Sequence, residues 1–480
     1  MEQIRKNVVY NVLLNVSRVI FPFITAPYIS RVLEPDGVGL SDFANYYASF
    51  FALVALLGIP TYGVREVAKR RSSPEALQST VSQLFSITVF SSLALTVVYL
   101  VSLLVVGQLN ENLPIFLIAG VTLYLAPLRT EWFYQGMEQF GYITARSLII
   151  KTISVICLFL FVRTKSDLIV YVILNALCSI ANDSWNFVKM IRSGIRPRIT
   201  VHGLRPHMRP ALLLLASSLA VSVYTMLDTE MLGFMADYEQ VGYYGRAANI
   251  SRMLVMAVTS ISIAVIPRVA QSAEVQNYAK VEDIINKSFA VVSFLAIPMS
   301  VGLCCIAPTF APLFYGELFV GTGVPLMIMS FDVLMIGLNN LISMQGLVGM
   351  GHDGLFLKSV LSGSVINVLV NLLLIPRLGA VGAAIASVGA EFLVLVVSAV
   401  YLYRRTPVRI HNLSGLWKGL AGSLLFIPLL LLLKPHLAGW PLVIVFVCAG
   451  FLLYVGVQFL LRNTTIDLLL PIIQDKFKKK

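Results

Sequence analysis

Charge is scarce in this sequence. Only 12% of its 480 residues are Asp, Glu, Lys or Arg, whereas soluble domains carry roughly a quarter. The sequence also lacks the patterns of bond-breaking chemistry: it has no Gly-rich phosphate-binding loop followed by Lys and Ser or Thr, and its five histidines show no metal-ligand spacing. These absences exclude an ATPase domain on this chain, predict no metal and no cofactor, and argue against an enzyme.

Cysteine is also rare, and its distribution argues against a disulfide framework. The five cysteines all lie in apolar stretches without metal-like partners, which is typical of small packing residues. A cleavable signal peptide is not visible, because residues 1–6 are short and polar and the apolar run after them has spanning length.

Hydrophobic residues dominate what is present. They make up 58% of the chain, and the mean hydropathy is +0.83. That is about 278 residues, enough for roughly 14 spans of about 20 residues each. The composition excludes a secreted, cytosolic or fibrous protein and predicts an all-α polytopic membrane protein. Apolar runs between charged or Gly/Pro-containing breaks give fourteen predicted spans: 7–30, 40–62, 80–106, 113–130, 147–162, 168–188, 210–235, 240–266, 288–307, 323–346, 355–375, 379–403, 415–433 and 440–461.

The net charge of +12 fits the predicted topology. With a cytoplasmic N-terminus, 27 of the 36 Lys and Arg residues fall on the cytoplasmic side of these spans and only 5 on the opposite side. This is the positive-inside pattern of a membrane protein with an even number of helices, so both termini are predicted to be cytoplasmic. The basic excess therefore predicts no nucleic-acid partner.

The two halves of the chain echo each other at an offset of 203 residues. The sequence Gly37-Val38-Gly39-Leu40 corresponds to Gln240-Val241-Gly242-Tyr243, and Arg65 corresponds to Arg268. A fixed offset across a whole helix predicts two parallel six-helix bundles around a central cavity, which work by alternating access and are followed by two C-terminal helices. The predicted segments are 1–195 for the first bundle, 196–403 for the second, and 404–480 for helices 13 and 14 with a cytoplasmic basic tail.

Ionisable residues inside the predicted spans are candidate site residues, because a charge at membrane depth is costly unless it faces a wet cavity or a partner. Guanidinium groups bind phosphate oxygens bidentately, so a basic cavity suits a phosphate-bearing anionic substrate. The basic candidates are Arg18, Lys151, Arg246 and Arg252. The acidic candidates, either for ion coupling or for pairing with an arginine, are Asp42, Asp228 and Glu391.

Three stretches of the sequence indicate more than the general class of polytopic membrane proteins. They read Glu131-Trp132-Phe133-Tyr134-Gln135-Gly136-Met137-Glu138; Leu227-Asp228, Met231-Leu232-Gly233 and Val241-Gly242-Tyr243-Tyr244-Gly245-Arg246-Ala247; and Tyr62-Gly63-Val64-Arg65-Glu66-Val67-Ala68-Lys69. Together they closely resemble the Wzx-type polysaccharide repeat-unit flippases of the multidrug/oligosaccharidyl-lipid/polysaccharide exporter superfamily. The resemblance covers nearly the whole chain and includes the fourteen-helix count, and the first stretch is the most specific.

The resemblance implies a bacterial inner-membrane protein that moves undecaprenyl-pyrophosphate-linked oligosaccharide from the cytoplasmic to the periplasmic leaflet, for O-antigen, capsule or exopolysaccharide. In the related lipid II flippases, cavity arginines on the first, second and eighth helices serve the pyrophosphate. Arg18 matches the first-helix position and Arg246 or Arg252 the eighth, whereas the second span has no arginine, only Asp42. Sugar contacts, or equally interfacial or packing roles, are expected of Asn45, Tyr46, Tyr47, Tyr224, Tyr244 and Asn249.

Further partners and the energy source follow from the same resemblance. Membrane lipids and the polysaccharide polymerase machinery are the partners expected beside the lipid-linked oligosaccharide. Without an ATPase, the energy would come from a proton or Na⁺ gradient or from downstream consumption of the flipped lipid.

Three other functions remain open. A cation-coupled multidrug antiporter of the same superfamily would need carboxylates facing the N-terminal cavity, but the first span carries Arg18 and no acid. A major-facilitator transporter also has two six-helix bundles, but its Gly-x-x-x-Asp-Arg-x-Gly-Arg-Arg-like loop after the second span is missing. A non-transporting scaffold of the polysaccharide machinery would have no reason to keep buried charges.

Overall fold

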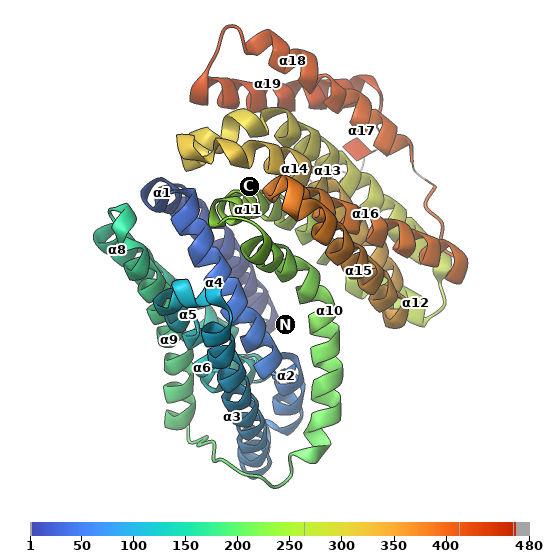
Figure 1. The fold of residues 1–480 in the computed structure, drawn as a ribbon. Helices are drawn as coiled ribbons and strands as arrows, with labels where there is room; N and C mark the ends of the chain where they lie inside the picture. Colours follow the sequence, from blue (N-terminus) through green and yellow to red (C-terminus); the bar gives the residue numbers. More distant parts are fainter. Residues whose placement is uncertain (1, 264, 412, 464, 467–480) are drawn as a thin grey trace. The chain divides into compact units, whose positions relative to one another are not determined.

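A computed structural model describes residues 2–263, 265–411, 413–463 and 465–466 of the chain. These residues form helices and connecting loops and contain no strand (Figure 1). They divide into two compact units, Met1–Phe234 and Met235–Lys480, which are described separately. The predicted basic tail, which ends in Lys478-Lys479-Lys480, lies outside the described residues.

The first unit combines packing between helices that follow each other in the sequence with packing between helices that are far apart in it. Its helices are α1 (Glu2–Ala55), α2 (Ile59–Arg70), α3 (Pro74–Val105), α4 (Gly107–Glu111), α5 (Leu113–Ala119), α6 (Val121–Tyr124), η1 (Ala126–Leu128), α7 (Glu131–Gly136), α8 (Phe140–Phe161), η2 (Lys165–Asp167), α9 (Leu168–Arg192) and α10 (Arg205–Met235).

The first two predicted spans are the two arms of α1. Glu34 interrupts the helix with φ 60° and ψ 173°. Pro35 follows directly, and a proline disfavours helical geometry at the residue before it. Pro22 and Pro27 lie inside the first arm, where each removes a backbone hydrogen-bond donor. Local sequence therefore accounts for the break between these spans.

Two of the family-like stretches pack against each other in the first unit, because glycine lets α2 and α7 approach closely. A Cβ atom on Gly63 would lie 2.6 Å from the ring of Trp132, and one on Gly136 would lie 2.7 Å from the side chain of Val67. Trp132 belongs to a buried apolar cluster that also contains Ile59. The glycines of both stretches thus serve helix packing.

The second unit contains the remaining helices. They are α11 (Tyr238–Ile263), α12 (Ile266–Glu274), α13 (Tyr278–Tyr315), η3 (Glu317–Thr322), α14 (Gly323–Asn339), the π-helix η4 (Asn340–Val348), α15 (Asp353–Leu378), α16 (Ala380–Arg405), α17 (Ser414–Leu424), α18 (Phe426–Leu433) and α19 (Gly439–Leu460). α14 packs on α11, α13 and α16, while α15 pairs with α16. The C-terminal helices α17, α18 and α19 pack on α13, through a cluster that includes Ile306, Phe426 and Tyr454.

Each of the fourteen predicted spans coincides with a helix or a broken helix over its described residues. By length and hydropathy alone, nine helices in the described parts of the chain can cross a membrane, and α1 with α2 adds a pair bent by 42°. The remaining predicted spans are the broken segment Leu113–Leu128 and the charge-bearing helices α10 and α11. Large apolar side chains such as Leu93, Val105 and Leu460 face outward from the helices. The chain is an all-α, multi-pass membrane protein.

The boundary between the two units lies at the end of α10, between Phe234 and Met235, and the beginning of α10 contacts α2 and α3. The hydroxyl of Tyr62 lies 2.9 Å from Nδ1 of His207, and Nε2 of His207 lies 2.8 Å from the side-chain oxygen of Gln83. The segment boundaries predicted after residues 195 and 403 come from the sequence repeat, whereas the unit boundary reflects contacts between helices. The predicted segment boundaries therefore stay predictions.

Candidate functional site

Two of the predicted basic residues lie close together in the first unit. Arg18 is exposed on α1, and Lys151 is half-buried on α8, which packs on α1. The two positive charges are near enough to repel each other. The ammonium group of Lys151 also lies 5.7 Å from the ring centroid of Phe21, one helical turn from Arg18. The first arm of α1 and α8 therefore form one basic patch.

The two predicted arginines of the second unit differ in exposure. Arg246 is buried in α11, with its guanidinium carbon 6.0 Å from the ring centroid of Tyr315 on α13. The hydroxyl of Tyr315 donates a hydrogen bond to the Arg246 carbonyl oxygen at 3.1 Å. Arg252 is exposed on the same helix. Of the two, Arg252 is the one that a ligand reaches without repacking.

The predicted acidic residues are all at least half-buried. Asp42 is half-buried in α1, Asp228 is buried in α10, and Glu391 is buried in α16. The carboxylate of Glu391 accepts a hydrogen bond from Asn339 at 3.3 Å, next to the π-helix η4. Ser343 of η4 donates to the Asn339 side-chain oxygen at 2.7 Å, so Glu391 belongs to a polar network inside the second unit. π-helical turns often mark functional sites.

Three of the predicted sugar contacts have hydrogen-bond partners within their own units. Asn45 donates to the carbonyl of Ser41 one turn earlier at 2.8 Å, and the Tyr47 hydroxyl donates to Ser102 at 2.8 Å. The other residues of this set are the buried Tyr244, whose hydroxyl lies 2.9 Å from that of Ser387, the half-buried Tyr46 and Asn249, and Tyr224, whose side chain lies outside the described residues. Asn45, Tyr46, Tyr47 and Asn249 are all half-buried, so exposure does not separate them as candidates.

Glu230 is a buried acid that the sequence analysis missed. It is only 6% exposed, and neither carboxylate oxygen has a hydrogen-bond partner among the described residues. Its surroundings in the first unit are aromatic. Tyr47 and Tyr99 both interact electrostatically with its carboxyl group, and the ring centroids of Tyr47 and Phe234 are 5.9 Å apart. The spacing Asp228-x-Glu230 within one apolar span is the signal that could have identified it.

The most specific family-like stretch forms a charged cluster with α8 and α9. Arg146 is 3% exposed and donates to the carboxylate of Glu131 at 2.9 Å. The hydroxyls of Tyr134 and Tyr142 donate to the backbone and side-chain oxygens of Asn186 at 2.8 and 3.2 Å. The ammonium of Lys189, from the next turn of α9, lies 3.2 Å from the ring centroid of Tyr142. The sequence indicated the stretch but not these partners on α9.

His207 is the titratable link between α10 and its neighbours. The neutral imidazole satisfies both its contacts, because Nε2 donates to Gln83 while Nδ1 accepts from Tyr62. Burial lowers the pKa of His207, an effect that Glu66 opposes and Arg70 reinforces. The unfolded chain, with a His pKa of about 6.5, therefore binds the proton more readily than the folded chain does. This contribution to stability is present above that pKa and is lost as pH falls below it.

We expect the thermal midpoint of the purified protein to decrease as the pH is lowered from about 7 to about 5.5. The decrease should be larger in wild type than in His207→Gln. Gln keeps hydrogen-bonding groups but does not titrate. His436→Gln, at an exposed loop position, is the matched control and should behave as wild type. Equal losses in wild type and His207→Gln, measured by scanning fluorimetry in detergent, would contradict the assignment.

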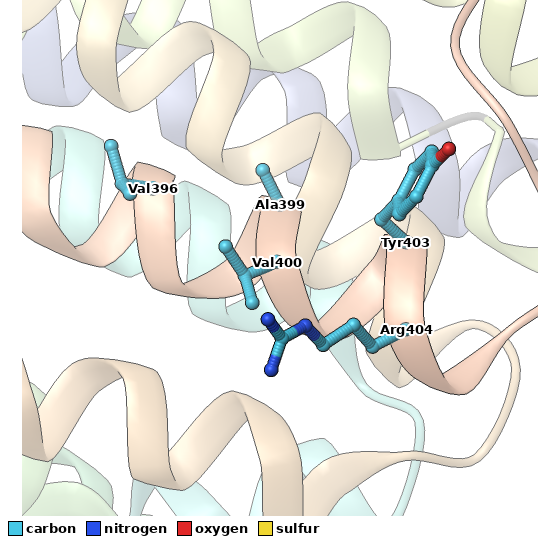
Figure 2. Close-up of a pocket in the computed structure, with 5 residues that line it drawn as sticks. All are labelled: Val396, Ala399, Val400, Tyr403 and Arg404. Atoms are coloured by element: carbon cyan, nitrogen blue, oxygen red, sulfur yellow. The ribbon is translucent and has the colours of Figure 1, made fainter.

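Each unit has a cavity that opens on its described surface. One, of about 380 Å³, lies along α16 and is lined by Val396, Ala399, Val400, Tyr403 and Arg404. Figure 2 shows the Arg404 side chain turned back along the helix toward Val400. The second, of about 470 Å³, lies between α2 and α10. Neither is lined by a predicted site residue.

Sequence comparisons identify two families. Residues 4–273 match the family described as "Polysaccharide biosynthesis protein", and residues 214–373 match the family described as "MatE". A protein of Escherichia coli named "Putative O-antigen transporter" is 24% identical over 400 residues, which cover 82% of this chain and 94% of that protein. "Probable flippase AglR" of Haloferax volcanii is 27% identical over 191 residues, 40% of this chain and 39% of the relative.

Solved structures show the same fold. The lipid II flippase MurJ in an inward closed conformation has a TM-score of 0.78 at 16% identity and covers 95% of this chain and 99% of its own. A multidrug resistance MATE family transporter in an inward-facing conformation has a TM-score of 0.59 at 16% identity. The match covers 81% of this chain and 94% of the transporter chain. With more than half of its length matched, the chain belongs to the polysaccharide biosynthesis protein family, the Wzx-type branch of the multidrug/oligosaccharidyl-lipid/polysaccharide exporter superfamily.

Proposed function

We propose that this protein is a flippase that moves undecaprenyl-pyrophosphate-linked oligosaccharide repeat units across the bacterial inner membrane by alternating access. The observation that carries this proposal is the similarity, over 82% of the chain, to a protein named as an O-antigen transporter. The fold shared with a lipid II flippase supports it. Relatives with transporter and flippase names also support a transporter in preference to an enzyme.

The proposed mechanism follows from the chemistry of the substrate. An oligosaccharide is too polar to cross hydrocarbon, so it needs a hydrated passage, while the polyprenyl tail can stay in lipid. In our proposal basic residues bind the pyrophosphate, and the candidates are Arg18 and Lys151 in the first unit and Arg246 and Arg252 in the second. The candidates for the sugar contacts are Asn45 and Tyr46 in the first unit and Tyr244 and Asn249 in the second.

Ion coupling is the second part of the proposal. Asp42, Asp228 and Glu391 are the acids proposed to carry a proton or Na⁺ or to pair with the arginines. We add Glu230 to this set, because it is buried and neither of its carboxyl oxygens has a hydrogen-bond partner among the described residues. We also propose that both termini are cytoplasmic and that the polysaccharide polymerase machinery receives the product.

Complementation tests this function. In a strain that lacks its own repeat-unit flippase, the wild-type gene is expected to restore surface polysaccharide. Arg18→Ala and Arg252→Ala, at matched membrane levels, should each lower it by about tenfold or more, since each loses a charged hydrogen bond to phosphate. Arg→Lys at the same positions keeps the charge and should retain more activity.

The controls separate the function from the residue assignments. Alanine variants as active as wild type would contradict the arginine assignments while leaving the flippase function intact. A wild-type gene that restores nothing in strains with several different glycans would contradict the flippase function itself. The match to the MatE family makes cation-coupled drug efflux the second candidate, and drug resistance in the same strains would then identify it.

A further inference from the structure

The cavity between α2 and α10 has the size and lining of a ligand site. It measures about 470 Å³, within the range of about 300–1,000 Å³ typical of small-molecule pockets. α2 contributes Tyr62, Arg65, Glu66 and Lys69, and α10 contributes Pro210, Leu213 and Leu214. These seven residues are called the α2–α10 pocket below.

The polar side of the pocket carries a surplus positive charge. Arg65 and Lys69 lie one turn apart on α2, and both are exposed. The buried Glu66 is already paired with Lys69 at 3.1 Å and with Arg70. Within the described part of the chain, Arg65 makes no ion pair or hydrogen bond, so its guanidinium is available to an anion.

The opposite side of the pocket is apolar and open. Leu213 is 62% exposed, and it lies beside Leu214 and Pro210 on the first turns of α10. A free inorganic anion would leave these side chains in contact with water. An amphiphile with an anionic head and a hydrocarbon chain would use both sides of the pocket.

The pocket is held open by contacts that need no ligand. Tyr62 forms part of its wall and is fixed through His207 to Gln83 on α3. Gly58, just before α2, allows the backbones of α2 and α10 to approach closely. The two walls are therefore positioned before any ligand binds.

We propose that the α2–α10 pocket binds the phosphate head group and the first chain carbons of an anionic glycerophospholipid from the cytoplasmic leaflet. Because Glu66 is paired with Lys69 and Arg70, Arg65 is the lining cation without an ion pair among the described residues, and one such cation matches a phosphodiester with one negative charge. Lys69, Arg70 and Arg71 at the end of α2 belong to the predicted cytoplasmic side, where anionic lipids attract basic residues.

Native mass spectrometry of the full-length protein tests this site without any transport assay. The purified protein is titrated with phosphatidylglycerol, with phosphatidylcholine of the same chains, with undecaprenyl phosphate and with inorganic phosphate. Wild type is expected to bind phosphatidylglycerol most tightly. Arg65→Gln should weaken this binding about fivefold and Arg65→Gln/Lys69→Gln about 25-fold, whereas Lys287→Gln on α13, at an exposed position, should leave it unchanged.

Leu213→Asn tests the apolar side. This variant should weaken the binding of phosphatidylglycerol but not the binding of inorganic phosphate. The proposal is overturned if the double variant binds phosphatidylglycerol as wild type does, or if Lys287→Gln weakens it equally. Equal binding of phosphatidylcholine, tighter binding of undecaprenyl phosphate, or phosphate alone binding as tightly as the lipid would each overturn the assignment of this lipid. Because none of these readouts requires flipping, their failure is distinct from a failure to complement.

Discussion

Glu131→Ala is expected to destabilise the folded protein by about 3–5 kcal/mol, because it leaves the guanidinium of Arg146 buried without its counter-charge. Arg146 is 3% exposed, whereas Glu131 is 36% exposed. The effect should therefore be asymmetric. Removing Arg146 leaves a carboxylate that water can reach, so Arg146→Met should cost clearly less than Glu131→Ala.

The double variant Glu131→Ala/Arg146→Met provides the control, since it removes both charges and keeps an apolar side chain of similar length. It is expected to recover most of the thermal midpoint lost by Glu131→Ala alone. The measurement is the thermal midpoint and the monodisperse fraction of purified protein in detergent. A double variant as unstable as Glu131→Ala would show that the lost interaction is not the uncompensated charge.

Gly58→Val should be nearly as damaging, at about 2–5 kcal/mol. Gly58 has φ 72° and caps the beginning of α2. A Cβ at this position would lie 2.6 Å from the Ala211 carbonyl oxygen and 2.6 Å from the Leu215 amide nitrogen, and both belong to the backbone of α10. Unlike a side chain, these backbone atoms can move away only if α10 moves as a whole.

Gly456→Ala on α19 is the matched control, because nothing lies within 4 Å of the added Cβ and its φ is not left-handed. It is expected to be neutral or to stabilise by up to about 1 kcal/mol. Thermal midpoints of both variants and wild type give the comparison. A Gly58→Val protein with a wild-type midpoint would contradict the close approach of α2 and α10.

The helices themselves were predictable from the sequence, because the length of each apolar run and the position of prolines and charges are local properties. The break at Glu34 follows from the proline after it, whereas the single span predicted at 113–130 is divided into shorter helices in the structure. Asp228, which the sequence placed inside a span, is buried in α10, and its proposed role stays a prediction. The family followed from the stretch beginning at Glu131, which the match over residues 4–273 confirms.

The surroundings of the individual side chains could not be predicted, since they depend on which distant helix covers each face. Arg246 and Arg252 look equivalent in the sequence, yet one is buried against Tyr315 and the other is exposed. Glu230 was missed because its surroundings, which include Tyr47 and Tyr99 from α1 and α3 and no hydrogen-bond partner among the described residues, depend on distant helices. Which of these residues handle the substrate stays a prediction.

The position of the unit boundary has a mechanical consequence. α10 ends at Met235 and α11 begins at Tyr238, so only Ala236 and Asp237 join a helix packed in the first unit to a helix packed in the second. Two residues offer four soft backbone torsions. Any tension or twist transmitted between the units along the chain must pass through these torsions. A stiffer linker at these two residues would therefore restrict rotation of one unit relative to the other, and a longer linker would let the two units move more independently.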